Sequence, residues 1–196
     1  MQTVTKTSNV YHFNELSDRA KDAAYYQWVS NADYDSNCNM DTLKEFEGLF
    51  NVKAYDWQYD ECTYNYHFRT SYDNGIDELS GERLYKFIIN NYYEYLFKSK
   101  TYYSEDYNKS RKSRISIQKN SMLAGLYADD EILAPIYAFL KRPDKNTTFY
   151  GLIDKCLDNF FDYCKKDYEW SISKERFDEE CREMGHLFYE NGEMYN

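Results

Sequence analysis

The stretch 52-VKAYDWQYDECTYNYHFR-69 decides how the rest of the chain is interpreted. On both sides of the polar link Asp60-Glu61-Cys62, aromatic residues occupy every second position. This period of two predicts two strands joined by a turn. One face of this hairpin would carry a row of rings, namely Tyr55, Trp57, Tyr59, Tyr64, Tyr66 and Phe68. Because an isolated hairpin is only marginally stable in water, we expect these rings to pack on helices or on a partner.

Apolar residues that recur every three or four positions predict helices on both sides of the hairpin. Before the hairpin, Ser17 is the expected N-cap of one helix and Asp41 that of a second. After it we expect a helix over 82–97, a helix capped by Asp129 that contains Pro135, a helix from Thr147 or Thr148 to about Lys165, and a helix from Ser173 to Gly185. A short strand is expected at 114–118, and residues 187–195 predict a closing hairpin with a type I′ turn at Asn191-Gly192.

This order of strands and helices has no regular alternation, so the predicted fold class is α+β, with helices packed on a small antiparallel sheet built around the aromatic hairpin. A length of 196 residues suits a single domain, 1–196, which could carry a helical C-terminal lobe from about residue 126. The N-terminal residues lack the apolar core of a signal peptide, and no apolar run reaches membrane-spanning length. Five scattered cysteines predict reduced thiols in a cytoplasmic protein.

The net charge of −10 disfavours non-specific binding to nucleic acid and favours a basic partner. Residues 98–119 depart from this pattern, because they hold seven basic and two acidic residues. We interpret this basic strip as a solvated loop that protects a strand edge from aggregation, with direct contact to guide RNA or DNA as an alternative.

No motif for catalysis or phosphate binding is present, so we expect a protein that is not an enzyme and requires no cofactor. Zinc is the one metal that the sequence suggests, through Cys156, Cys164, Cys181 and His186. Eight residues of helix would place Cys156 and Cys164 about 12 Å apart along the axis, so only one of them could join the other two ligands. Buried, unligated thiols are the preferred interpretation.

The sequence gives stronger evidence for protein binding than for catalysis or metal binding. Tyrosine offers a large and rigid contact area, and acidic loops lie close to the hairpin in the sequence. Carboxylates interleaved with rings fit a groove lined with Arg and Lys. The expected partner contacts are Asp56, Tyr59, Asp60, Glu61, Asp73, Asp77 and Glu78.

Three segments of the chain resemble segments of known proteins. They are 11-YHFNELSDRAKDAAYYQW-28, 126-LYADDEILAPIYAFLKRPDKNTTFYGLIDKCLDNF-160 and 171-SISKERFDEECREMGHLFYENGEMY-195. The first resembles the Y-x-F-x-E-L-S-x-x-A-K-x-x-A opening of small phage and prophage accessory proteins, some of which are described as antitoxin-like. The second is similar to their Asp-rich helix and Lys/Arg-Pro-Asp turn, and the third to their closing helix and F-x-E-N-G hairpin. The chain departs from this family at Ser121–Gly125, where relatives often have a Cys before the Gly.

The resemblance implies a phage accessory protein that acts in the cytoplasm of the infected bacterium. Acidic proteins of this kind include anti-CRISPR inhibitors, which help a phage to evade host defence. Those directed at type II systems bind the effector nuclease or its guide-RNA complex, whose nucleic acid lies in a positively charged channel. We therefore expect a stoichiometric inhibitor of such a nuclease. The alternatives are an antitoxin-like or regulatory protein-binding module and a zinc-dependent binder or enzyme.

Overall fold

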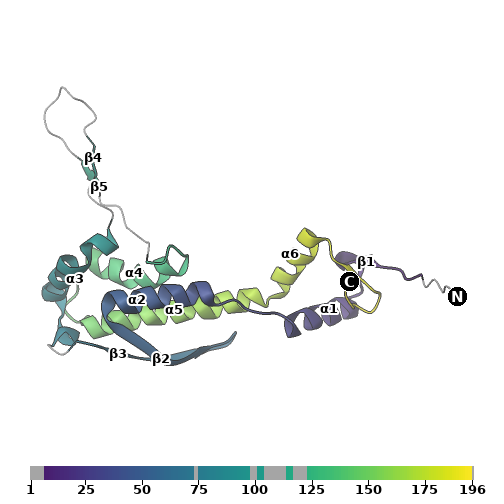
Figure 1. Ribbon diagram of the computed structural model, residues 1–196, viewed down its shortest axis with the longest axis horizontal. Coiled ribbons are helices and arrows are strands. Elements are labelled where there is room, and N and C mark those ends of the chain that lie inside the picture. The colour runs from purple at the N-terminus through teal and green to yellow at the C-terminus, as the bar shows by residue number, and fades with distance from the viewer. Residues whose placement is uncertain (1–6, 73–74, 98–100, 104–113, 117–122, 196) are drawn as a thin grey trace, which may run out of the picture. The chain divides into compact units, whose positions relative to one another are not determined.

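The computed structural model describes residues 7–72, 75–97, 101–103, 114–116 and 123–195 (Figure 1). The elements are, in chain order, β1 (Tyr11–His12), η1 (Phe13–Glu15), α1 (Asp18–Ser30), α2 (Asn37–Phe50), β2 (Val52–Tyr59), β3 (Tyr64–Thr70), η2 (Ile76–Glu78), α3 (Gly81–Leu96), β4 (Thr101–Tyr103), β5 (Arg114–Ser116), α4 (Ala128–Lys141), α5 (Phe149–Ser171), α6 (Lys174–Met184) and β6 (Leu187–Phe188). Helices with small antiparallel pairs of strands confirm the predicted α+β class.

The chain divides into two compact units. Unit 1 comprises residues 1–35, 60–62 and 166–196, and unit 2 comprises residues 36–59 and 63–165. Residues 126–165 therefore group with the aromatic hairpin, whereas the remaining C-terminal residues group with the N-terminal helix. The single domain with a helical lobe from about residue 126 stays a prediction.

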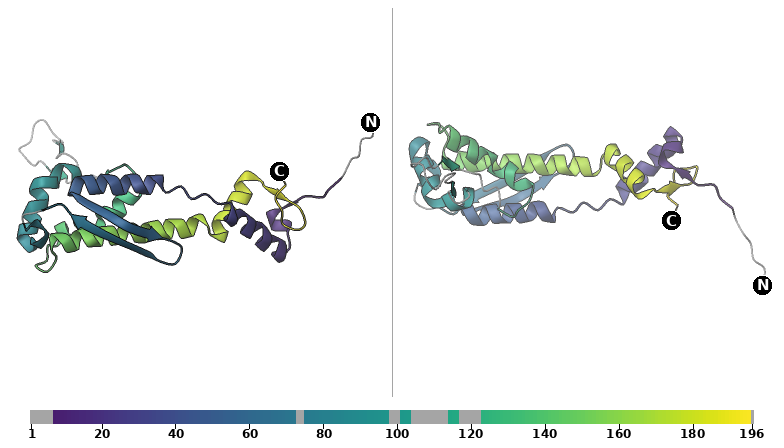
Figure 2. Two further views of the ribbon diagram at one scale, coloured as in Figure 1. Left: turned by 60° about the horizontal axis from the view of Figure 1, so that its bottom comes forward. Right: turned by 90° about the horizontal axis from the view of Figure 1, so that it is seen from above.

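The core of unit 2 is built from helices α2 to α5 and the inner face of the β2–β3 hairpin. In Figures 1 and 2 the hairpin runs beside helices α2 and α5. The largest fully buried side chains of this unit come from all four helices: Phe46, Phe50, Leu84, Ile88, Leu96, Ile132, Leu133, Phe149, Phe160 and Phe161. Half of these side chains are phenylalanines, which bury a large area per residue.

A β-bulge in strand β2 changes which residues face this core. Asp56 adopts the left-handed conformation with φ 48°, and the register of the hairpin shifts between Tyr55 and Gln58. The extra residue turns Trp57 to the side of the buried Ala54, with its ring 5.8 Å from that of Phe161. Tyr55 lies on the other face, so the prediction that all the rings share one face was wrong.

Helix α4 is held by a buried carboxylate that was expected to be its N-cap. The helix begins at Ala128, one residue before Asp129, which is completely buried. Its Oδ2 accepts the backbone N–H groups of residues 123–126 at 2.8 to 3.3 Å, and its Oδ1 accepts the hydroxyl of Thr42 at 2.8 Å. The side chain thus ties the preceding loop and helix α2 to helix α4 instead of capping its own helix.

Helix α4 also continues past Pro135, the proline that was expected inside it. Pro135 lies inside the helix and cannot donate a hydrogen bond to the carbonyl of Glu131. The side-chain amide of Asn159, on helix α5, donates to that carbonyl at 3.4 Å and so replaces the missing donor.

Most of the predicted helix starts are confirmed. Ser17, Thr148 and Ser173 each accept a backbone N–H three residues later, at 3.1 to 3.3 Å. The prediction for Asp41 was wrong, because the hydrogen bonds of helix α2 already begin with the N–H of Met40 and the carbonyl of Ser36. Helix α5 ends at Ser171, beyond the predicted Lys165.

Unit 1 packs helices α1 and α6 around a smaller core. Phe177 is buried beside Trp28, with ring centroids 5.1 Å apart. Strand β1 pairs with β6, and the chain then turns so that Phe188 bridges to Met194. The closing hairpin is confirmed but its turn is not type I′, because Gly192 has φ 90° while Asn191 does not have a positive φ. A three-residue loop with a left-handed glycine closes it instead.

Candidate protein-binding surface

Helix α5 places aspartates beside the tyrosines of strand β3. A spacing of four residues puts Asp154, Asp158 and Asp162 on one face of the helix. The hydroxyl of Tyr64 donates to Oδ1 of Asp158 at 2.8 Å, and that of Tyr66 donates to Oδ1 of Asp154 at 3.0 Å. We call these five residues the tyrosine–aspartate surface.

Burial and the neighbouring aspartates raise the pKa of both phenols, which act as hydrogen-bond donors. Partial burial, followed by the hydrogen bond and charge of Asp158 and the charge of Asp162, raises the pKa of Tyr64 to about 12. Burial and Asp154 raise the pKa of Tyr66 even further. Asp154 and Asp158 are exposed and Asp162 is half-buried, so the carboxylates of this surface are open to a partner.

A packed aromatic layer supports the tyrosine–aspartate surface. The ring of Tyr66 stacks on the fully buried Phe161 with centroids 5.0 Å apart and planes inclined by 15°. Further along the hairpin, Phe68 stacks on Tyr150 of helix α5 at 4.5 Å. Because these rings hold the hairpin on the helix, binding a partner would order few additional side chains, which lowers the entropy cost.

Several of the predicted contact residues lie near the hairpin turn. Asp56 is exposed at the bulge, and Tyr59 is half-buried with its ring stacked on that of Trp57 at 6.1 Å. Asp60 and Glu61 are exposed in the turn itself. Oδ1 of Asp60 accepts the N–H of Cys62 at 2.8 Å, so this carboxylate stabilises the turn.

Other predicted contacts lie at the opposite end of the hairpin. Asp77 and Glu78 belong to η2, where Oδ2 of Asp77 accepts the hydroxyl of Thr70 at 2.6 Å. From Thr70 to Tyr64 the strand covers about 20 Å. Asp73 lies outside the described residues. The described positions therefore do not form one continuous patch.

Two cross-strand pairs on the solvent face of the hairpin contain basic residues and no carboxylate. Lys53 is paired with Arg69, and Tyr55 with His67; all four are exposed. The ammonium group of Lys53 also forms a 2.6 Å ion pair with Glu47. The carboxylates that accept hydrogen bonds from Tyr64 and Tyr66 thus come from helix α5 and not from the strands.

The four zinc candidates are mainly core residues. Cys156 and Cys164 are buried in unit 2, whereas Cys181 is buried in unit 1. Burial, followed by the nearby acidic charges, raises the pKa of Cys181 to about 12, which disfavours the thiolate that zinc requires. His186 lies 3.8 Å from Glu180. In the described part of the chain, no three His, Cys, Asp or Glu side chains gather as a metal site, and zinc binding stays a prediction.

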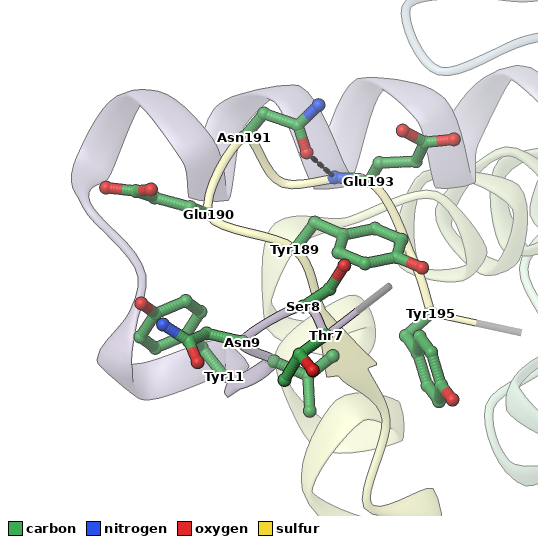
Figure 3. A pocket seen from close by; sticks show the side chains of 10 residues that line it. Thr7, Ser8, Asn9, Tyr11, Tyr189, Glu190, Asn191, Glu193 and Tyr195 are labelled. Carbon is green, nitrogen blue, oxygen red and sulfur yellow. Dashed lines mark hydrogen bonds between the residues drawn. The ribbon is translucent and has the colours of Figure 1, made fainter. Parts of the chain in front are cut away.

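A hollow of about 1020 Å³ opens in unit 1 between residues 7–11 and the closing turn (Figure 3). Tyr189 and Tyr195 form an edge-to-face pair at 5.7 Å on one side of it. In Figure 3 the carboxylates of Glu190 and Glu193 point away from each other. They therefore do not form the convergent pair that acid–base chemistry needs.

The basic strip at 98–119 falls mostly outside the described residues. Only the backbone segments β4 and β5 belong to it, and they pair antiparallel from Thr101–Ser116 to Tyr103–Arg114. This agrees with the strand predicted around residue 114, while the contact to nucleic acid stays a prediction.

Sequence reasoning missed the aspartates of helix α5, although the pattern D-x3-D-x3-D at 154–162 could have indicated them.

Within the described residues, no helix combines the length and the apolar character that crossing a membrane requires. No protein-family model, curated protein or solved structure matches the chain.

Proposed function

We propose that this protein is a stoichiometric inhibitor that docks its tyrosine–aspartate surface on a basic region of a partner protein. We further propose that it is phage-encoded and that the partner is the effector nuclease of a type II CRISPR system. Occupation of the positively charged channel would prevent the nuclease from binding or cleaving nucleic acid.

The observation that carries the proposal is the regular spacing of carboxylates on helix α5. Asp154, Asp158 and Asp162 recur every four residues, which corresponds to about 6 Å along the helix axis. Tyr64 and Tyr66 hold two of these side chains in place. A rigid row of carboxylates suits an array of Arg and Lys side chains, because Arg binds a carboxylate through two parallel hydrogen bonds.

The net charge of −10 supports the same kind of partner. A strongly acidic protein is attracted to a basic surface from a distance, which accelerates association at low salt. The resemblance to phage accessory proteins, which include anti-CRISPR inhibitors, is the reason for proposing a host nuclease as the partner. An antitoxin-like module would use the same surface, and only the identity of the partner distinguishes the two.

The test combines a pull-down from host lysate with a DNA-cleavage assay of the purified type II effector and its guide RNA. The surface variant is Asp154→Asn, Asp158→Asn and Asp162→Asn, in which the amides still accept the phenol hydrogen bonds. The control variant neutralises three exposed carboxylates of helices α2 and α3, namely Asp41→Asn, Glu45→Gln and Glu94→Gln.

We expect the parent and the control to inhibit cleavage at about one molecule per nuclease, and the surface variant to lose inhibition while remaining folded. Full inhibition by the surface variant would reject the tyrosine–aspartate surface. Capture of a small toxin or a transcription factor would favour the antitoxin-like function. Inhibition at strongly substoichiometric protein would indicate an enzyme.

A further inference from the structure

A second surface feature lies in unit 2, between helices α3 and α4, and shares no residue with the tyrosine–aspartate surface. It is a groove of about 590 Å³. Helix α3 and its C-cap line it at every fourth position with Tyr85, Ile89, Tyr93 and Phe97, and helix α4 lines it with Ala134, Tyr137, Ala138, Leu140 and Lys141. This volume lies in the range of small-molecule sites, about 300–1,000 Å³.

The walls of the groove are fixed by contacts between the two helices. The hydroxyl of Tyr137 donates to the carbonyl of Leu96 at 2.9 Å, and its ring lies 5.9 Å from that of Phe97. Phe97 in turn packs on Tyr93 at 5.1 Å. The small side chains of Ala134 and Ala138 leave the space open. The groove is therefore preformed, and no wall has to be ordered when a ligand enters.

The dimensions of the groove select a narrow occupant. From Tyr85 to Phe97 the lining residues of helix α3 extend over about 18 Å at 1.5 Å per residue. A volume of about 590 Å³ spread over this length gives a mean cross-section of about 30 Å². A single aliphatic chain fits along a groove of this length and cross-section.

The charge of the groove selects the head group. Among its described lining residues only Lys141 is charged, although the protein as a whole carries a net charge of −10. An ammonium group beside an otherwise apolar surface complements a ligand with one carboxylate and an apolar tail. We propose that the groove between α3 and α4 binds a linear fatty acid, with its tail along the aromatic ladder of helix α3 and its carboxylate at Lys141.

The proposal predicts how affinity depends on chain length. Each buried methylene contributes about 0.8 kcal/mol, so affinity should rise about fourfold with each carbon until the groove is full. The experiment titrates octanoate, decanoate and dodecanoate into the full-length protein and follows the backbone amides of Ala134, Ala138 and Lys141 by NMR. Decanol, which has the same tail without a charge, tests the head group.

Two variants with matched controls test the location. Ala138 is exposed, so Ala138→Trp fills the groove without entering the core, and Ala138→Ser leaves it open. Lys141→Gln removes the charge at the groove, whereas Lys155→Gln removes an exposed charge on helix α5. We expect Ala138→Trp to lose binding at least tenfold, and Lys141→Gln to weaken decanoate but not decanol. The two control variants should bind as the parent does.

Several results would overturn the proposal. If none of the three acids binds saturably, or if Ala138→Trp binds decanoate as tightly as Ala138→Ser, the groove is not a fatty-acid site. Equal affinities for decanol and decanoate would show that the carboxylate does not contribute to binding, contrary to the proposal. None of these outcomes bears on the proposed inhibitor function, because the two surfaces are separate.

Discussion

Replacing Asp129 should be the most damaging single change of a polar residue in unit 2. Its carboxylate is completely buried and accepts five hydrogen bonds, four from the N–H groups of residues 123–126 and one from the hydroxyl of Thr42. Asp129→Ala leaves all five donors without this acceptor. It also releases the loop that leads into helix α4.

The magnitude follows from the environment of the donors. Hydrogen bonds to charged groups contribute about 1.5–3 kcal/mol each, and five of these would approach the whole stability of a domain. The loop N–H groups are only partly buried, however, so water can replace the carboxylate in part. We therefore take about 1 kcal/mol for each bond and expect Asp129→Ala to lower the free energy of unfolding by about 4–5 kcal/mol.

Two milder variants separate the hydrogen bonds from the cavity. Asp129→Asn keeps one oxygen for the loop and directs its amide group to the hydroxyl of Thr42, so we expect a loss of about 1–2 kcal/mol. Thr42→Val removes one donor and should cost about 1 kcal/mol in the parent. In the Asp129→Ala background the same change should cost almost nothing, because its acceptor is already gone.

Urea unfolding measures these differences if the signal comes from unit 2. The chain has three tryptophans, of which Trp57 belongs to unit 2 and Trp28 and Trp170 to unit 1. Replacing the latter two by Phe makes the fluorescence of Trp57 the reporter for all variants. A loss below about 1 kcal/mol for Asp129→Ala, or an equal cost of Thr42→Val in both backgrounds, would refute this account of the buried carboxylate.

Three further predictions concern the backbone and the tyrosines. Gly192→Ala should destabilise unit 1 by more than about 1 kcal/mol in urea unfolding, because φ is 90° and the new Cβ would lie 2.2 Å from the carbonyl oxygen of Ala20. At Asp56, with φ 48°, substitution by Gly should leave the melting temperature equal or higher, whereas Val should lower it; the reverse order would contradict the bulge. The pKa of Tyr64 is raised from 10.0 to about 12, so the unfolded state loses its proton first and the free energy of unfolding should fall from about pH 10 to 12. Tyr64→Phe should reduce that pH dependence, and an unchanged slope would argue against the raised pKa.

Local sequence signals were sufficient for most helix boundaries. Ser17 and Ser173 each cap a helix through an N–H three residues away, and Gly185 ends α6 in the left-handed conformation. Such interactions involve residues within one turn, so their partners can be inferred from the sequence alone. Asp41 has the same capping chemistry but lies inside helix α2, which begins four residues earlier at Asn37.

Predictions were less accurate for residues whose contacts lie far away in the sequence. Asp129 was expected to cap helix α4, but it lies inside the helix, and Thr42, which it contacts, is 87 residues away in the sequence. The bulge at Asp56 also has no clear local signal, although it decides which rings of the hairpin reach Phe161. A shift of one residue in a strand reverses the faces of all later side chains, so alternation alone cannot assign them.

By itself, the sequence determined the α+β class, the aromatic hairpin, most helix starts and the excess of negative charge. These follow from periodicity, capping residues and composition, which act over a few neighbouring residues or over the chain as a whole. Only the tertiary structure decided where the carboxylates meet the tyrosines. Tyr64 and Tyr66 bind Asp158 and Asp154 across 94 and 88 residues of sequence, and the packing of the hairpin on helix α5 brings them within hydrogen-bond distance.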